Sequence, residues 1–312
     1  MAPSARLKLK AAHCWLLLPA LGLLELGGHF WTSRRAPTLA EWQELRPVVQ
    51  RLKKADELVV VAPEWADPLA RRALGDELLP IAMLSRPDAR GYQRALEVSA
   101  LGQRSTELDG WRETASERVG AFTVRRLENP SFTPVLYRFV DHVNPRELAV
   151  SEGDGESRDC AWQAQAPGLT GGLHGNVAFP RQRFGCRGGG PQLVGVTIID
   201  DQNYRPRRCI WAHPSLDGAL WLRFRDVPLG KKIRGYGGLS YFLARDGLGT
   251  PVELVVRAGG RELGRAIHQD EWGWRAFEVP TAELAGTTTE VEIEIRSASP
   301  EQRGFCFYAE SV

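Results

Sequence analysis

Cysteine is the residue type whose chemistry is easiest to interpret in this sequence. Cys14 lies in an apolar N-terminal stretch, and the exported part would hold Cys160, Cys186, Cys209 and Cys306. Four cysteines allow three connectivities. We expect Cys160–Cys186 and Cys209–Cys306, the second because the first and last strands of a β-sandwich often lie side by side. Two disulfides predict an oxidising compartment; four buried free thiols are the alternative.

Carboxylates and amides gather in one short stretch, Asp200-Asp201-Gln-Asn203. These groups offer the oxygen ligands that Ca²⁺ prefers. Adjacent residues of a strand point to opposite faces, so the spacing favours a plain acidic turn over a structural calcium site. Histidine spacing gives no zinc pattern. We therefore expect no resident cofactor.

Nucleophile motifs are missing from the sequence. Gly-x-Ser-x-Gly and His-Glu-x-x-His are absent, and Ser215 and Ser240 have no base nearby in sequence. His174 lies in a glycine-rich stretch, where an exposed site and a plain loop are the alternatives. The sequence identifies no catalytic residue, which favours a binding protein over an enzyme and leaves an unrecognised active site as the alternative.

Composition limits the partners. The chain has 40 basic against 38 acidic residues, and 43% of its 312 residues are hydrophobic. The longest basic groups are pairs, so nucleic acid is not an expected partner. These values are those of a globular protein, and the length suits two domains.

The N-terminus has the order of an export signal. Basic residues at positions 6, 8 and 10 precede an apolar run from Ala11 to Trp31, interrupted by Glu25 and followed by two arginines. About 20 apolar residues span a bilayer as a helix. We expect residues 1–35 to be an uncleaved signal anchor, with the remainder outside the cytoplasm in the periplasm. A cleaved signal peptide around Leu16–Leu24 and a buried soluble helix are the alternatives.

Residues 36–120 predict a small α/β unit. Thr38 and Glu41 have the spacing of a capping box at the start of a periodic helix. Glu57–Pro63 and Ile81–Leu84 are expected as strands, and Asp88 as the cap of a second helix. Strand, helix, strand and helix in this order predict a parallel pair.

The first of these strands ends without a glycine-rich phosphate loop, which argues against nucleotide binding. Glu64, Trp65 and Asp67 follow the strand, at the edge where α/β proteins bind ligands. A helix cap at Asp67 and a packed Trp65 are the favoured interpretation.

The rest of the chain is expected to be β structure. Residues 121–190 form an irregular, glycine-rich connecting region, and residues 191–312 form an antiparallel β-sandwich or jelly roll. Short strands separated by turn residues are typical of that architecture. Val291-Glu-Ile-Glu-Ile295 alternates apolar and charged residues, as a strand with one face in water does. The fold class is thus α+β.

The C-terminal part resembles a known fold family. Arg208–Pro214, Leu222–Gly230 and Gly235–Leu239 resemble the galactose-binding-like sandwich of carbohydrate-binding modules, over residues 192–312. Residues 56–85 also resemble extracytoplasmic parts of membrane glycosyltransferases that use lipid-linked sugars. Fold alone gives only an analogy for function.

The resemblance implies sugar binding by loops at one end of the sandwich. Its candidates are Arg234 and Tyr236 in one loop, with His268, Asp270 and Trp272 in another. A salt bridge or a solvated loop is the structural alternative for Arg234 and His268.

We therefore expect a membrane-tethered, non-catalytic envelope protein that binds a glycan. One alternative is an enzyme or accessory subunit of envelope polysaccharide assembly, which a deep cleft with carboxylates and His174 would favour. The other is a protein–protein assembly module that binds an envelope protein, which a flat apolar patch would favour. A shallow aromatic platform at Tyr236 and Trp272 would favour sugar binding.

Overall fold

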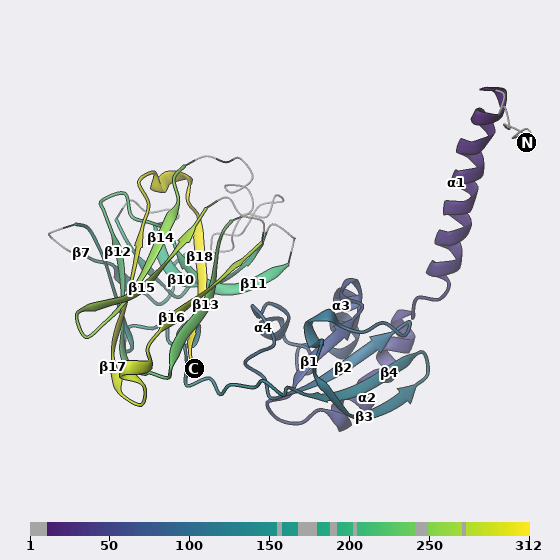
Figure 1. Ribbon diagram of the computed structural model, residues 1–312, viewed down its shortest axis with the longest axis horizontal. Coiled ribbons are helices and arrows are strands. Elements are labelled where there is room, and N and C mark those ends of the chain that lie inside the picture. Colours follow the sequence, from purple (N-terminus) through teal and green to yellow (C-terminus); the bar gives the residue numbers. More distant parts are fainter. Residues whose placement is uncertain are drawn as a thin grey trace, which may run out of the picture. The chain divides into compact units, whose positions relative to one another are not determined.

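The computed structural model describes most of the chain (Figure 1). Described are residues 11–154, 158–167, 180–187, 192–201, 205–240, 247, 249–269 and 273–312; within helices, the side chains at 11–16, 32, 33 and 302 are not described. The chain divides into two compact units, Met1–Leu78 with Ala95–Glu128 and Leu79–Arg94 with Asn129–Val312. Each unit is therefore built from two separate stretches of sequence.

The N-terminal segment forms a helix, α1, over Ala11–Ser33. The side chains described on it are exposed to solvent. Among the helices whose side chains the structure describes, none combines the length and the apolar character needed to cross a membrane. The predicted transmembrane span is therefore not supported.

Helix α2 of the first unit, Leu39–Leu52, begins where its capping residues predict. The hydroxyl of Thr38 accepts the Glu41 backbone N–H, and the Glu41 carboxylate accepts the Thr38 backbone N–H at 2.7 Å. This satisfies two of the donors that a helix start leaves unpaired. The buried ring of Trp42 lies 4.5 Å from that of Phe122, between centroids, and fixes the helix on the sheet.

The sheet of the first unit has the strand order β1-β2-β4-β3. Strands β1 and β2 are parallel, as the α/β prediction requires, and β3 and β4 form an antiparallel hairpin. Helix α3, Asp67–Leu74, follows β1. The strands are β1 Leu58–Ala62, β2 Arg94–Ala100, β3 Arg112–Val119 and β4 Phe122–Glu128.

Two predicted elements of this region are wrong. Ile81–Leu84, expected as the second strand, is a four-residue helix, α4. The helix expected after Asp88 is absent, and its last residues form β2 instead. Burial explains why a helix was predicted where the chain forms β2. Strand β2 is buried along almost its whole length, and a fully buried strand lacks the alternation that distinguishes a strand from a helix.

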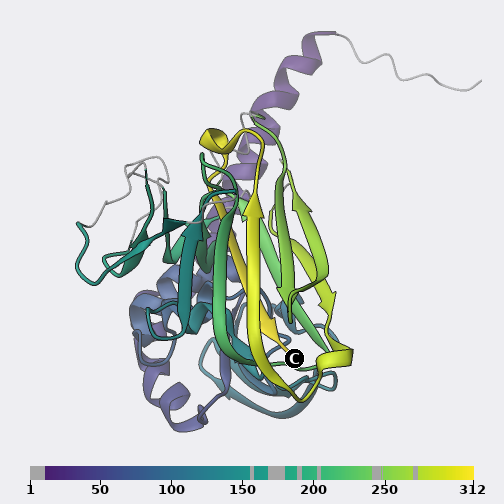
Figure 2. The ribbon, with the colours of Figure 1, turned by 90° about the vertical axis from the view of Figure 1, so that its left-hand side faces the viewer.

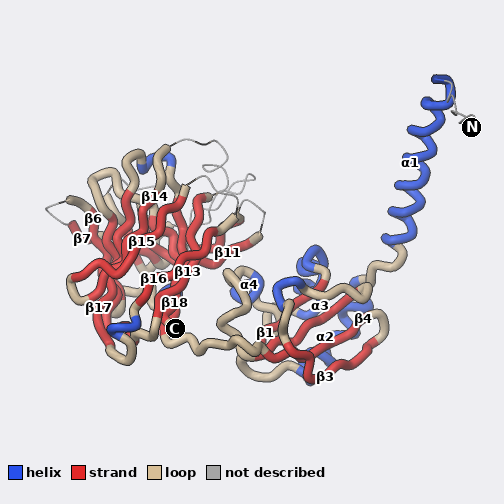
Figure 3. The backbone as a smooth tube through the Cα atoms, in the orientation of Figure 1, coloured by secondary structure: helices blue, strands red, loops and turns tan. Residues whose placement is uncertain are grey.

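The second unit is a β-sandwich of two antiparallel sheets (Figures 2 and 3). Within the described residues, one sheet has the order β16-β13-β18-β11-β10-β9-β8 with β5 paired to β18, and the other has the order β15-β14-β17-β12-β6-β7. This confirms the sandwich, but β5–β9 fall within the stretch that we expected to connect the domains. The first sheet comprises β5 Tyr137–Arg138, β8 Ala161–Gln163, β9 Arg183–Gly185, β10 Leu193–Asp200, β11 Pro206–Ala212, β13 Lys232–Leu239, β16 Arg275–Pro280 and β18 Phe305–Ser311. The second comprises β6 Leu148–Glu152, β7 Arg158–Asp159, β12 Leu220–Pro228, β14 Val252–Ala258, β15 Arg261–His268 and β17 Thr288–Arg296.

Alternation along the strands builds the core between the two sheets. On β18, Phe305, Phe307 and Ala309 belong to the hydrophobic core, so Cys306, Tyr308 and Glu310 lie on the other face of the strand. On β13, Ile233 and Leu239 are core residues. The even-numbered residues of these strands therefore form the outer face of the first sheet, where the site described below lies.

Both predicted disulfides are present. Cys160–Cys186 links the residues beside β8 and β9, with an S–S distance of 2.05 Å. Cys209–Cys306 links β11 to β18, which are neighbours in the first sheet, with an S–S distance of 2.03 Å. Both expected pairings are thus confirmed.

Candidate ligand-binding pocket

The segment between Leu79 and Arg94 leaves the first unit after α3 and belongs to the second unit. Its short helix α4 begins after Pro80 and is closed by Ser85, whose hydroxyl donates to the Ile81 carbonyl at 2.7 Å. Asp88 then makes a tight turn, because its carboxylate accepts the Arg90 backbone N–H at 2.9 Å. Asp88 was expected to cap a helix, but this bond to a residue two positions later is the typical aspartate turn.

Arginines of β11 hold this segment on the outer face of the first sheet. Arg207 Nη1 donates to the carbonyls of Arg86 and Pro87 at 3.0 and 3.1 Å. The Arg208 backbone N–H donates to the Ser85 carbonyl at 2.8 Å. Buried carbonyls need hydrogen-bond donors. The bonds from Arg207 and Arg208 satisfy the carbonyls of the segment without strand pairing, and they hold the segment against β11.

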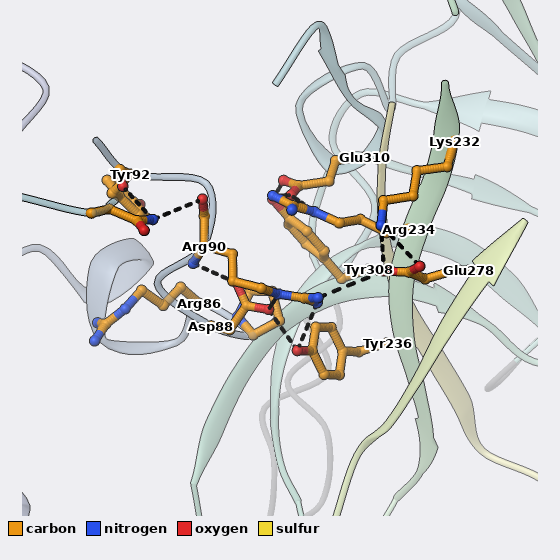
Figure 4. Close-up of polar contacts among 12 residues, drawn as sticks. Arg86, Asp88, Arg90, Tyr92, Lys232, Arg234, Tyr236, Glu278, Tyr308 and Glu310 are labelled. Carbon is orange, nitrogen blue, oxygen red and sulfur yellow. Dashed lines mark hydrogen bonds and ion pairs between the residues drawn. The ribbon is translucent and has the colours of Figure 1, made fainter. Parts of the chain in front are cut away.

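A row of alternating charges crosses four strands of the first sheet, and Figure 4 shows three of its members, Glu310, Arg234 and Glu278. In the register of the sheet, Glu310 of β18 is opposite Arg138 of β5 on one side and Arg234 of β13 on the other, and Arg234 is opposite Glu278 of β16. Arg234 Nε donates to Glu310 at 2.7 Å, whereas Arg138 Nε lies 3.9 Å from the same carboxylate. Tyr308 Oη also donates to Glu310, at 2.8 Å.

A second cluster joins the segment to β13 (Figure 4). Tyr236 Oη donates to the Asp88 carboxylate at 2.5 Å, and Arg90 Nε donates to it at 2.6 Å. Arg90 Nη2 donates to the oxygen of Tyr236 at 3.0 Å, and its Nη1 lies 3.7 Å from the Glu278 carboxylate. The three groups close a hydrogen-bonded triangle that fixes the turn at Asp88 on the sheet.

Between the segment and the sheet lies a pocket of about 290 Å³, which we call the Tyr308 pocket. Its walls combine two tyrosine rings, arginines, carboxylates, two prolines and a methionine. The lining residues are Pro80, Ala82, Met83, Arg86, Pro87, Asp88, Gly91, Tyr92, Arg138, Asp141, Arg208, Tyr308 and Glu310. A pocket of this size, at the lower end of the usual range for small ligands, suits a sugar unit rather than a folded partner.

The ionisable groups in and beside the Tyr308 pocket shift one another's pKa values. Burial raises the pKa of Tyr308, and the adjacent Glu310 carboxylate raises it further, so the phenol stays protonated and donates. Burial by itself would raise the pKa of Asp88, but hydrogen bonds from Tyr236 and Arg90 outweigh it and hold that pKa below its usual value. Burial and the Asp88 carboxylate raise the pKa of Tyr236 to about 12.

The structure places the predicted residues Arg234 and Tyr236 together, although not where they were expected. Both lie on strand β13, so their prediction as loop residues is wrong. Arg234 is buried in its ion pair with Glu310. Tyr236 supports Asp88, which lines the Tyr308 pocket. Arg234 and Tyr236 alternate with glycines along β13. This two-residue period indicates a strand, but the glycines made the stretch look like a loop.

His268 ends strand β15 and is only 1% exposed. Its ring lies 5.2 Å from that of Phe305, between centroids, and against Gly237 of β13, where a Cβ would lie 2.6 Å from Nε2. Burial and nearby Arg275 lower its pKa to about 4. His268 is therefore a core residue, which is neither the sugar-binding role nor the salt bridge or solvated loop that we expected for it. Asp270, Trp272 and His174 lie outside the described residues.

The acidic stretch at Asp200 has a described structural role. The Asp201 carboxylate accepts the Arg205 backbone N–H at 3.1 Å and Arg207 Nε at 3.0 Å. It therefore orients the arginine that holds the segment. Gln202 and Asn203, the other residues of this stretch, lie outside the described residues.

One further group in the described part of the chain has the proximity of metal ligands. Glu152, Cys160 and Cys186 place their ligand atoms within 4.8 Å of one another. The two cysteines form a disulfide, and a disulfide lacks the thiolate that binds a metal. The Glu152 carboxylate instead accepts Ser215 Oγ at 3.0 Å and the Arg187 backbone N–H at 2.7 Å.

The sequence did not identify most residues of the Tyr308 pocket. Tyr308 and Glu310 lie two positions apart on one strand, which placed them on one face but did not say which strands flank them. Arg138 and Asp88 come from stretches about 170 and 220 residues earlier in the chain. Only the sheet register and the path of the segment bring these residues together.

Comparison with known proteins gives fold likeness alone. No protein-family model matches the chain, and no curated protein matches it. Among solved structures, CBM51 from Clostridium perfringens GH95 in complex with methyl-galactose is 10% identical, with a TM-score of 0.28, over 38% of this chain and 81% of that one. The N-terminal cellulose-binding domain of Cellulomonas fimi β-1,4-glucanase C is 8% identical, with a TM-score of 0.23, over 55% of this chain and 89% of that one.

A third similar structure is TmCBM61 in complex with β-1,4-galactotriose, 12% identical with a TM-score of 0.23, over 37% of this chain and 78% of that one. All three are carbohydrate-binding modules by their names. Likeness this remote does not say what this chain binds. The expected likeness of residues 56–85 to glycosyltransferases has no counterpart among these structures.

Proposed function

We propose that this protein binds a glycan without chemically altering it, and that the sugar enters the Tyr308 pocket. The observation that carries the proposal is the combination of Tyr92 and Tyr308 with Arg138, Arg208 and Asp141 in one pocket of about 290 Å³. A sugar presents C–H faces to aromatic rings and hydroxyls to charged hydrogen-bonding groups. Arginine and carboxylate groups make the stronger, charge-assisted bonds.

The state of the carboxylates argues for binding rather than catalysis in this pocket. Glu310 is bonded by Arg234 and Tyr308, and Asp88 by Arg90 and Tyr236. A general acid needs a pKa near the working pH, whereas hydrogen bonds lower the pKa of Asp88. Both carboxylates hold neighbouring side chains in place, and the lowered pKa of Asp88 makes it unsuited to act as a general acid.

We also propose that the protein works outside the cytoplasm. The two disulfides, Cys160–Cys186 and Cys209–Cys306, support this location, because such bonds persist in oxidising compartments and are rare in the cytosol. An envelope location is compatible with a glycan ligand.

A glycan array with the full-length protein, disulfides formed, tests the proposed function. We expect selective binding to a subset of glycans, and loss of that binding in Tyr92→Ala. Trp65→Ala is the matched control, because Trp65 is an aromatic residue of the other unit that is 63% exposed and outside the pocket. A folded protein that binds no glycan, or a Tyr92→Ala variant that binds as well as the control, would contradict the proposal.

A further inference from the structure

The carboxylates that line the Tyr308 pocket are already paired with arginines. Three arginines and three carboxylates line the pocket, and Arg90, Arg234 and Glu278 lie beside it. Each carboxylate already has a close guanidinium partner. The pairs are Glu310 with Arg234 at 2.7 Å, Asp141 with Arg208 at 2.8 Å and Asp88 with Arg90 at 2.6 Å.

Arg138 is one of two lining arginines outside these three pairs; the other, Arg86, donates from Nη1 to the Met83 carbonyl. Its closest described carboxylate oxygen is that of Glu310, at 3.9 Å, and Glu310 is already neutralised by the nearer Arg234. The guanidinium lies over the ring of Tyr92, 6.0 Å from its centroid. Its side chain is 39% exposed, so its donors face a space that a ligand can enter.

Arg208 offers further donors to the same pocket. Its Nη1 donates to Asp141 at 2.8 Å, and its side chain is 30% exposed. A guanidinium carries five N–H donors in a planar fork, so one bond to Asp141 leaves others for a ligand. Arg138 and Arg208 thus line one pocket from β5 and β11, with the ring of Tyr308 between these strands on β18.

We infer that the glycan is acidic, and that Arg138 with Arg208 binds an oxyanion on its sugar ring. This inference rests on the proposed function and names the class of sugar. The carboxylate of a uronic acid matches the arginine fork with two parallel bonds; a sulfate or phosphate ester on a sugar presents the same chemistry.

Calorimetric titration of the full-length protein tests the inference with matched ligands. The probes are tri-galacturonate and a hyaluronan tetrasaccharide, each beside its methyl ester, together with galactotriose and a sulfated galactotriose. We expect an acidic probe to bind at least about tenfold more tightly than its uncharged counterpart, a difference of about 1.4 kcal/mol. The sulfated probe distinguishes a sulfate ester from a carboxylate as the anion.

Two variants locate the effect. Arg138→Gln keeps hydrogen-bonding capacity and removes the charge, so we expect affinity for the acidic probe to fall at least about tenfold further than affinity for its methyl ester, and the preference for the acidic probe to disappear. Arg261→Gln is the control, because Arg261 is 62% exposed and paired with Glu283 away from the pocket lining. Near-ultraviolet circular dichroism shows whether each variant keeps its tertiary packing.

The outcomes separate the two proposals. Equal affinity for the acidic probe and its methyl ester would overturn the acidic-ligand inference and leave glycan binding standing. A preference for the acidic probe that survives in Arg138→Gln would also overturn it. A folded protein that binds none of the probes would contradict both proposals.

Discussion

Glu310 is the residue on which the outer face of the first sheet depends. Arg234, Tyr308 and Arg138 all contact its carboxylate, and the residue is only 5% exposed. Removing one member of a buried ion pair leaves the other charge without compensation, which costs far more than the loss of an exposed pair. The pocket therefore relies on this carboxylate for the positions of Arg234 and Tyr308.

We predict that Glu310→Gln lowers the free energy of unfolding by about 3 kcal/mol or more. The variant keeps the shape of the side chain but leaves the Arg234 guanidinium, at 2.7 Å, without its counter-charge. Urea denaturation measures the change. Glu283→Gln is the control, since it breaks an exposed pair with Arg261 that should contribute about 0–1 kcal/mol. Equal effects of the two variants would contradict the importance of Glu310.

His268 should make the stability of the protein depend on pH. Its pKa of about 4 in the folded state lies below the ordinary value near 6.5, so the unfolded chain binds a proton more readily. Stability is then fully present above about pH 6.5 and is lost as the pH falls toward 4. Each pKa unit corresponds to about 1.4 kcal/mol, so we expect a loss of about 3 kcal/mol.

The measurement for His268 is the free energy of unfolding at pH 7, 5 and 4. The matched variant is His268→Gln, which removes the titrating group while other acids and bases remain. We expect the variant to lose less stability than the wild type over this range. Parallel pH profiles for the two proteins would show that another group is responsible.

At the scale of elements, the path of the Leu79–Arg94 segment is what creates the pocket. The segment has one short helix and no strand pairing with the described part of the sandwich, so a few side chains and two backbone bonds, to the carbonyls of Ser85 and Gln93, hold it. Arg207 is the main support, because it bonds two consecutive carbonyls of the segment and is itself oriented by Asp201. Segments with few such contacts open locally at low free energy.

We predict that Arg207→Ala releases the segment while the sandwich stays folded. Hydrogen exchange at residues 86–92 should become faster by about tenfold or more, since a loss of 1.4 kcal/mol in local stability has that effect. Glycan binding should weaken with it. Arg225→Ala is the control, because Arg225 bonds only the Arg146 carbonyl on the exposed side of the other sheet. Unchanged protection at 86–92 would contradict this account.

At the scale of the whole molecule, both disulfides lie in the second unit. Cys209–Cys306 closes a loop over a sequence separation of 97 residues. Native disulfides of this kind typically contribute about 2–4 kcal/mol. The first unit depends instead on its packed sheet and on buried ion pairs such as Glu57 with Arg126, at 2.8 Å.

We predict that reduction destabilises the two units unequally. Differential scanning calorimetry with and without dithiothreitol should show one transition at a lower temperature after reduction and one that hardly moves. Alkylation followed by mass spectrometry confirms that Cys160, Cys186, Cys209 and Cys306 have been reduced. A uniform shift of all transitions would mean that the units unfold as one cooperative body.

Local physical rules in the sequence determined a definite part of this protein. The Thr38–Glu41 capping box and the alternating strands follow from residues that are close in sequence. The disulfide pairing was one of only three possible connectivities. Tertiary structure decided the rest: that Ile81–Leu84 is helical, that β2 replaces a predicted helix, and that Arg138, Asp88 and Glu310 meet. These outcomes depend on burial and on strand register between distant segments, and neither quantity is encoded in the spacing of neighbouring residues.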